Sequence, residues 1–242
     1  LRDIEMMLYD DKVKAVFAAR GGYGCGRLLK ELNVRIFAEN PKWMAGFSDV
    51  TALMAAVNRH AGIETLHTLM PFSLYSHDDF DPESLETLMK GLTGQKLSYK
   101  HTPHDLNNFG SAKGILTGGN LSVLYSLAGT PYEPEYKERI LFLEDVDEYL
   151  YHIDRMILNF ELRGVFDEIS GLIVGSFNDM NDSKISFGKS AYEIIAERAN
   201  KYHIPTLFGF PAGHKNRNHT LIFGREVTLT VGGDYATLDF SG

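Results

Sequence analysis

A strand that turns into a helix at a serine is the feature that most constrains this chain. The apolar run from Trp43 to Phe47 predicts a short buried strand, and a helix follows that ends near Gly62. Apolar residues repeat along this helix at the spacing of one packed face, namely Val50, Leu53, Met54 and Val57. Ser48 stands at the junction. Strands alternating with helices are typical of parallel sheets, so the fold class predicted here is α/β.

Ser48 has two interpretations at this junction. Serine is a preferred N-cap, because its hydroxyl accepts hydrogen bonds from free backbone N–H groups. The same place exposes a hydroxyl at the carboxyl end of a strand, beside a helix N-terminus that favours developing negative charge, and this suits a nucleophile. Local sequence favours the cap, so the choice depends on residues elsewhere in the chain.

A glycine-rich turn, residues 20–27, follows a predicted strand at 13–19 and precedes a predicted helix at 28–32. This layout is typical of phosphate-binding loops, but its glycine spacing does not fit the dinucleotide template, and no acidic residue stands at the ribose position. The turn is otherwise a tight bend that uses glycine, or a loop whose backbone N–H groups serve the neighbouring strand-end site.

Composition excludes several classes of partner. The 242 residues carry a formal net charge of −8, which argues against nucleic acid or an anionic membrane as the main partner. No apolar run reaches the roughly 18 residues of a transmembrane helix, and no signal peptide is recognisable. The single cysteine, Cys25, fits a reducing compartment. We therefore expect a soluble, cytoplasmic protein.

The sequence divides into two predicted lobes. Residues 1–77 form an N-terminal α/β lobe that carries Ser48, residues 78–113 connect the lobes and contain a helix at 82–92, and residues 114–242 form the C-terminal lobe. The predicted strands of the second lobe are 139–143, 171–175, 206–209, 220–223, 226–231 and 235–240, and its helices are 121–128, 147–163 and 188–202. Leu1 falls inside an amphipathic pattern, so we expect further sequence to precede it.

Three side chains follow apolar strands and have the chemistry of acyl transfer: Ser48, Glu144 and His214. Such a reaction needs a nucleophile, a base with a pKa near neutral, and a group that orients the base. Each residue also has an ordinary structural explanation: Ser48 as a helix cap, Glu144 as a solvated strand end and His214 as a turn residue. A Gly-x-Ser-x-Gly elbow is absent, because Val50 occupies the place of the second glycine.

Five short runs occur in a fixed order along the chain. They are Ala19-Arg20-Gly21-Gly22-Tyr23-Gly24, Gly46-Phe47-Ser48-Asp49-Val50-Thr51, Leu143-Glu144-Asp145-Val146, Ile153-Asp154-Arg155, and Gly213-His214 with Asn218-His219-Thr220-Leu221. Together they resemble the serine LD-carboxypeptidases, a family that includes the microcin C immunity proteins. In that family a Ser-Glu-His triad hydrolyses the bond before a terminal D-alanine of muropeptides. By motif position, the resemblance assigns these roles to Ser48, Glu144 and His214.

The resemblance also implies an architecture. It implies an N-terminal flavodoxin-like lobe that is truncated in this chain, since family members begin with a further strand and helix, and a C-terminal lobe built around a small β-barrel. It implies a homodimer, no metal and no cofactor. After His67 the chain reads Thr68-Leu69-Met70-Pro71 where the family pattern has a glycine–proline pair, so that wall of the site is expected to differ.

The predicted function is removal of the C-terminal D-alanine from murein tetrapeptides in peptidoglycan recycling. The backbone N–H groups of Asp49 and Gly22 are the predicted oxyanion hole, and Gly21 and Tyr23 are candidate substrate contacts. One alternative is an immunity-type hydrolase that cleaves aminoacyl-nucleotide antibiotics. Another, from a different class, is a non-catalytic α/β protein whose glycine-rich loop binds an anionic ligand.

Overall fold

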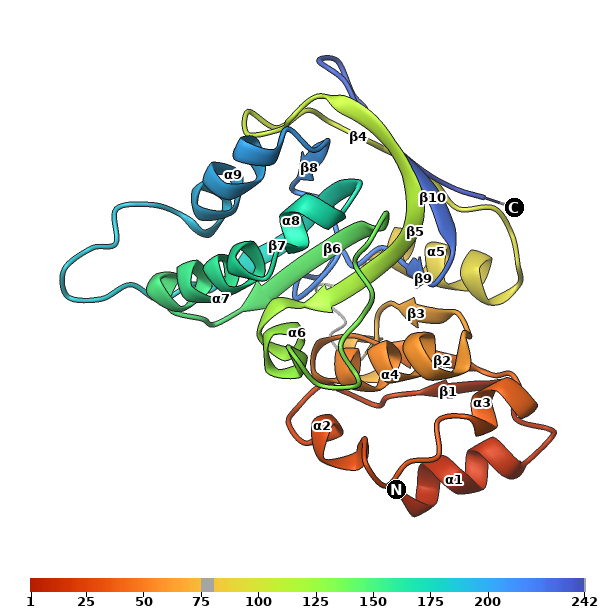
Figure 1. The fold of residues 1–242 in the computed structure, drawn as a ribbon. Helices are drawn as coiled ribbons and strands as arrows, with labels where there is room; N and C mark the ends of the chain where they lie inside the picture. The colour runs from red at the N-terminus through yellow and green to blue at the C-terminus, as the bar shows by residue number, and fades with distance from the viewer. Residues whose placement is uncertain (75–80, 242) are drawn as a thin grey trace.

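The structure, a computed structural model, describes residues 1–74 and 81–241. An N-terminal lobe lies beneath a larger lobe whose helices α7 and α9 pack on one side of a long sheet (Figure 1). None of the helices in the described ranges is both long and apolar enough to cross a membrane.

The N-terminal lobe is built on a four-stranded sheet of order β1-β2-β3-β9. Its strands are β1 (Ala15–Phe17), β2 (Trp43–Gly46), β3 (Thr65–His67) and β9 (Leu221–Phe223). Its helices are α1 (Arg2–Tyr9), α2 (Cys25–Leu28), α3 (Ile36–Glu39) and α4 (Thr51–Ala61), with 3-10 turns η1 (Ser48–Val50) and η2 (Pro71–Leu74). The first three strands are parallel, and β9 joins β3 in the antiparallel direction.

The second lobe is built on a seven-stranded sheet of order β4-β11-β10-β5-β6-β7-β8. Its strands are β4 (Ser98–His101), β5 (Gly110–Asn120), β6 (Ile140–Val146), β7 (Gly171–Asn178), β8 (Thr206–Phe208), β10 (Glu226–Val231) and β11 (Ala236–Phe240). Its helices are α5 (Pro82–Leu92), α6 (Leu121–Leu127), α7 (Leu150–Leu162), α8 (Val165–Glu168) and α9 (Ala191–Tyr202). Strands β5 to β8 are parallel, whereas β4, β11, β10 and β5 pair antiparallel. The predicted α/β fold class is confirmed.

The parallel strands are buried on both faces. Along β6, Ile140 and Phe142 belong to a core that also contains the N-terminal lobe, whereas Leu141 and Leu143 pack under helices α7 to α9. Successive side chains of a strand point to opposite faces, so Glu144 shares the face of Phe142. The carboxylate is therefore directed at the lobe that carries Ser48.

A close approach of the backbone of β5 to Thr51 packs helix α4 against the second lobe. A Cβ built on Gly119 would lie 2.6 Å from Thr51 Oγ1, and the Thr51 hydroxyl accepts a hydrogen bond from the Asn120 amide at 3.1 Å. Gly119 has φ +134°, a conformation that L side chains rarely adopt. Glycine at this position thus lets the start of α4 meet the carboxyl end of β5.

Several predicted elements need correction. The helix expected at 28–32 is instead the single turn α2, Cys25–Leu28. The connection expected at 78–113 contains a strand of the second sheet, β4, and the first residues of β5. The run predicted at 220–223 forms a strand, but it belongs to the sheet of the N-terminal lobe. Residues 75–80, at the predicted boundary near 77, lie outside the described residues.

Candidate active site

Ser48 lies on a sharp turn between β2 and α4. It has φ +63°, so a residue with a Cβ is held in the left-handed region, a strained conformation that clusters at functional sites. Neither η1 nor α4 has a side-chain cap, so the N-cap interpretation of Ser48 is wrong. The turn instead presents the hydroxyl at the carboxyl end of the strand, as a nucleophile elbow does.

The glycine-rich loop lies against this turn. A Cβ built on Gly21 would lie 3.0 Å from Ser48 Oγ, a distance tighter than most real Cβ contacts, so the loop backbone approaches the serine closely. The Cys25 amide donates to the Asp49 carboxylate at 2.9 Å and ties the loop to the residue after the serine. Gly22 has open space where its Cβ would be, and Tyr23 is 87% exposed. Gly21 thus lies beside the serine, and Gly22, the next residue, is exposed.

Glu144 and His214 form a hydrogen-bonded pair. His214 Nδ1 lies 2.7 Å from Glu144 Oε2, and the carboxylate is completely buried. With Nδ1 as the donor, Nε2 is the nitrogen that can accept a proton. The Asn178 side-chain amide donates to the His214 carbonyl at 2.8 Å and holds the backbone of the histidine loop. The structure therefore supplies an imidazole whose ring is oriented by a carboxylate.

Burial lowers the pKa of His214, but the hydrogen bond that His214 donates to Glu144 and the charges of Glu144 and Asp145 outweigh it, so the net shift is upward from 6.5. Asp145 is itself buried, and burial followed by the charge of Glu144 raises its pKa to about 6. Its carboxylate accepts hydrogen bonds from the Asn120 side chain and from the amide of Ser122. Two adjacent carboxylates therefore favour the imidazolium form of the histidine.

Phe47 connects the serine turn to the histidine. Its ring packs edge-on against His214, with the ring centroids 4.8 Å apart. Among the described residues Ser48 Oγ makes no hydrogen bond, so the link between the serine turn and the imidazole is the ring of Phe47, the residue before Ser48. Catalytic hydrogen bonds are often long in unliganded enzymes and shorten when substrate binds.

A cavity of about 270 Å³ adjoins His214. Phe47, Leu69 and Phe72 form apolar walls, and Asp81 and Lys215 add charges of opposite sign. Leu69 belongs to the segment Thr68-Leu69-Met70-Pro71, which replaces the glycine–proline pair of the family pattern. This segment therefore does form part of the cavity wall. A larger cavity of about 730 Å³ lies around Arg59, Glu133 and Arg163, away from the serine and the histidine. We place the candidate site at the smaller cavity because His214, the predicted base, lines it.

One cluster near this cavity has the donors of a cation site. Single ligand atoms of Asp81, Glu83 and His219 lie within 4.8 Å of one another. Arg217 already pairs with Asp81 at 3.2 Å and with Glu83 at 3.7 Å, so its guanidinium supplies the positive charge that these carboxylates need.

Sequence reasoning missed several neighbours of the pair. Asp145 and Asn218 stand inside the quoted motifs, but no local pattern indicated their roles. Asp145 raises the pKa of His214, and Asn218 holds the loop that carries this histidine. Asn218 Oδ1 accepts a hydrogen bond from the Gly213 amide at 3.0 Å. His67 is completely buried beside Phe47, and a lone histidine at a strand end gave no sign of this.

Comparison with known proteins places these observations in a family. The model of the LD-carboxypeptidase N-terminal domain matches residues 1–68, and that of the LD-carboxypeptidase C-terminal domain matches residues 113–229. A probable murein peptide carboxypeptidase of Bacillus subtilis is 30% identical over 241 residues, which cover 99% of this chain and 76% of that protein. The murein tetrapeptide carboxypeptidase of Pseudomonas aeruginosa is also 30% identical over 241 residues, covering 95% of this chain and 76% of that protein.

A solved structure and a relative of another activity complete the comparison. The crystal structure of muramoyltetrapeptide carboxypeptidase from Oxalobacter formigenes has a TM-score of 0.91 and 29% identity, and the match covers 100% of this chain and 82% of that one. The microcin C7 self-immunity protein of Escherichia coli is 28% identical over 260 residues, covering 94% of this chain and 74% of that protein. On the matches to both domain models and to these relatives, the chain belongs to the LD-carboxypeptidase family.

Proposed function

We propose that this chain is a serine-type LD-carboxypeptidase that releases the C-terminal D-alanine of murein tetrapeptides. The observation that carries the proposal is the Glu144–His214 pair, which packs against Phe47, the residue that precedes Ser48 on its strained turn. The names of the Bacillus and Pseudomonas relatives support the substrate class. Location in the cytoplasm and a homodimer stay predictions from the sequence.

The proposed reaction follows from the roles of the three side chains. Ser48 Oγ attacks the carbonyl before the terminal D-amino acid, and His214 Nε2 takes the hydroxyl proton. Glu144 accepts the Nδ1 hydrogen bond, orients the ring and stabilises the imidazolium. His214 then gives the proton to the leaving amine, and water releases the acyl group from the serine by the same steps in reverse order.

The oxyanion of the tetrahedral intermediate needs donors about 3 Å away that are in place before the reaction. The Asp49 amide follows the nucleophile at the start of a helical turn, and the Gly22 amide is the proposed second donor. The contact between Gly21 and Ser48 supports this part of the proposal, because it brings the glycine-rich loop beside the reacting oxygen. Gly21 and Tyr23 remain proposed substrate contacts on that loop.

The test is release of D-alanine from a purified murein tetrapeptide. We expect Ser48→Ala and His214→Ala to lower kcat by roughly 10⁴–10⁶, and Glu144→Ala to lower it less, because orientation is only part of the work of the base. Ser183→Ala, which removes the hydroxyl of an exposed serine, is the matched control and should retain full activity. If the parent releases no D-alanine, and Ser48→Ala leaves binding of an anionic ligand unchanged, the non-catalytic alternative is favoured.

A second candidate function rests on the similarity to the microcin C7 self-immunity protein. An enzyme of that type would cleave an aminoacyl-nucleotide conjugate with the same serine and histidine. Measuring kcat/KM for the tetrapeptide and for an aminoacyl-nucleotide side by side separates the two functions. A higher kcat/KM for the nucleotide conjugate would replace the murein substrate in the proposal and leave the chemistry of the triad unchanged.

A further inference from the structure

A β-bulge lies beside Glu144. Strands β6 and β7 pair Leu143 with Val174 and then Asp145 with Phe177. Two residues of β7, Gly175 and Ser176, therefore stand opposite the single residue Glu144. Bulges of this kind leave one residue unpaired and re-aim a side chain, and they are frequent next to active sites.

Two buried polar atoms at this bulge have no hydrogen-bond partner among the described residues: Ser176 Oγ and Glu144 Oε1. Ser176 is only 4% exposed and Glu144 is fully buried. Buried hydroxyl and carboxylate oxygens are nearly always hydrogen-bonded, since leaving one unpaired loses the solvation it had in water. One of these atoms can donate a hydrogen and the other can only accept.

The two groups meet at Gly213. A Cβ built on Gly213 would lie 2.3 Å from Ser176 Oγ and 2.8 Å from Glu144 Oε2, so these two oxygens are at most about 5.1 Å apart, the sum of the two distances. The Ser176 amide also donates to the Ala212 carbonyl at 2.9 Å, which fixes the bulge to the loop that carries His214. A hydrogen bond between them requires the Ser176 hydroxyl to turn toward the carboxylate by rotation about its side-chain bonds.

We propose that Ser176 is a positioning residue of the catalytic apparatus, whose hydroxyl donates to Glu144 Oε1 while Oε2 accepts from His214. The carboxylate is then held at both oxygens, so its plane and the imidazole ring bonded to it have one orientation. No proton is transferred in this contact, because the serine remains neutral and the carboxylate remains ionised. This role rests on the proposed function, in which His214 is the base.

The hydroxyl also changes the acidity of the pair. The pair has a net negative charge when His214 is neutral, and no net charge when His214 is protonated. The positive end of the hydroxyl dipole stabilises the negative state more than the uncharged one. Removing the hydroxyl therefore raises the pKa of His214. The other titratable groups around the pair are Asp145 on β6, His67 on β3, and Asp81 and Lys215 beside the cavity. These groups are the same in the variant, so the difference between the two proteins isolates the serine.

The experiment compares Ser176→Ala with Ser170→Ala, in which the same atom is removed just before β7 begins. We expect Ser176→Ala to lower kcat on the order of tenfold with KM unchanged, and the acid limb of the kcat profile to move to higher pH. Ser170→Ala should match the parent. A positioning role is overturned if Ser176→Ala leaves kcat and the acid limb unchanged, if only KM rises, or if Ser170→Ala has the same effect.

A second measurement needs no substrate. The pKa of His214 is followed by NMR of the imidazole carbon-bound protons in the parent and in both serine variants. An upward shift confined to Ser176→Ala supports the contact, and identical titrations refute it. Because this result is independent of turnover, a parent that releases no D-alanine would count against the proposed function and would leave the contact to be decided by the titration.

Discussion

The buried imidazole of His67 departs from the rule that buried polar groups are hydrogen-bonded. It is enclosed by the rings of Phe47, Phe142 and Phe223, with centroids 5.0 to 5.8 Å away, and neither ring nitrogen has a partner among the described residues. Burial, followed by the charge of His214, lowers the pKa of His67 to about 3. The ring is thus neutral at every pH at which His214 acts as a base, and its polar atoms destabilise the fold.

Replacing His67 by phenylalanine should stabilise the protein. The variant buries no unpaired nitrogen in a cage of three aromatic rings, so we expect its free energy of unfolding at pH 8 to exceed that of the parent by about 1–3 kcal/mol. As pH falls from 6.5 toward 3, the unfolded parent binds a proton at His67 that the native parent does not bind, so the parent loses stability. The difference between the two proteins should widen over that range.

Urea unfolding at pH 8, 6 and 5 measures this difference. Asp145 acts in the opposite direction, since its pKa is raised to about 6 and the native state takes up its proton first as pH falls. That contribution is common to both proteins and cancels in the comparison. A difference that stays constant with pH would mean that His67 titrates normally in the native protein.

At the scale of elements, the N-terminus of α5 supports the loop that carries His214. Asp81 caps the helix by accepting hydrogen bonds from the amide and hydroxyl of Ser84 at 2.9 and 2.7 Å. Ser84 Oγ in turn accepts from the amide of Asn218 at 2.8 Å, and the Asn218 side chain accepts from the Gly213 amide. A continuous series of hydrogen bonds therefore joins the helix cap to the residue before the histidine.

Two variants of Asn218 distinguish the contribution of its hydrogen-bond acceptor oxygen from that of its side-chain volume. Asn218→Asp keeps an oxygen for the Gly213 amide, whereas the similarly sized Asn218→Leu removes it and leaves a buried donor unpaired. We expect Asn218→Leu to lower kcat by roughly 10-fold to 100-fold, in line with the 1–3 kcal/mol of an unsatisfied buried group, and Asn218→Asp to retain most of the parent kcat. Steady-state kinetics on the tetrapeptide gives both values. Equal losses in the two variants would show that the acceptor oxygen is not what matters.

Elements set by near neighbours in the sequence were predicted well. Asn120 caps α6 by accepting from the Val123 amide, as predicted, and the hairpin of β10 and β11 forms around Gly232. Elements whose position depends on pairing with distant parts of the chain were not predicted. β4 has a single buried side chain, Tyr99, so its periodicity is too weak to distinguish an edge strand from a loop. The placement of β9 depends on pairing with β3, which no local pattern encodes.

The candidate site divides in the same way. The positions of Glu144 and His214 after strands, together with the family motifs, predicted that these two residues share a site. The structure confirms that they are hydrogen-bonded. The left-handed φ of Ser48 and the bulge at Ser176 depend on how the backbone is held by neighbouring strands, so neither was visible in the sequence.

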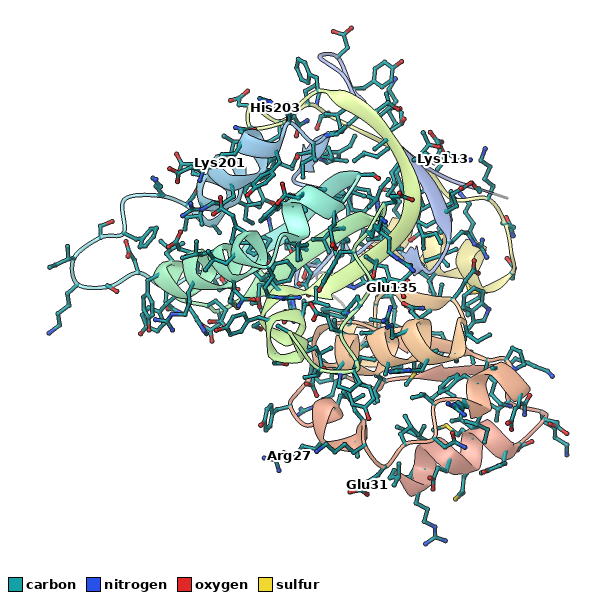
Figure 2. All side chains as sticks on the ribbon, viewed as in Figure 1. Arg27, Glu31, Lys113, Glu135, Lys201 and His203 are labelled. Carbon is teal, nitrogen blue, oxygen red and sulfur yellow. The ribbon has the colours of Figure 1, made fainter. Side chains whose placement is uncertain are left out.

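At the scale of the whole molecule, the two lobes are interlocked. β9 comes from the C-terminal part of the chain and completes the sheet of the N-terminal lobe, and one buried core contains residues of both lobes. Arg225, next to β9, makes a bidentate ion pair with Glu64 at 2.6 and 2.9 Å. Arg59 of α4 pairs with Glu135, which Figure 2 shows where the lobes meet. Separating the lobes would expose this shared core and break one sheet.

We therefore expect the lobes to unfold together, although chains of this size commonly unfold in steps. Trp43, the single tryptophan, lies on β2 and reports on the N-terminal lobe, whereas most of the helical residues, and so most of the far-ultraviolet circular dichroism, belong to helices α5 to α9 of the other lobe. The two signals should change at the same urea concentration. In Arg225→Ala both midpoints should fall together, by an amount that corresponds to roughly 1 kcal/mol for a partly exposed bidentate pair. If the Trp43 signal changed first, the N-terminal lobe would be an independent unit, and the shared core would not couple the serine turn to the Glu144–His214 pair.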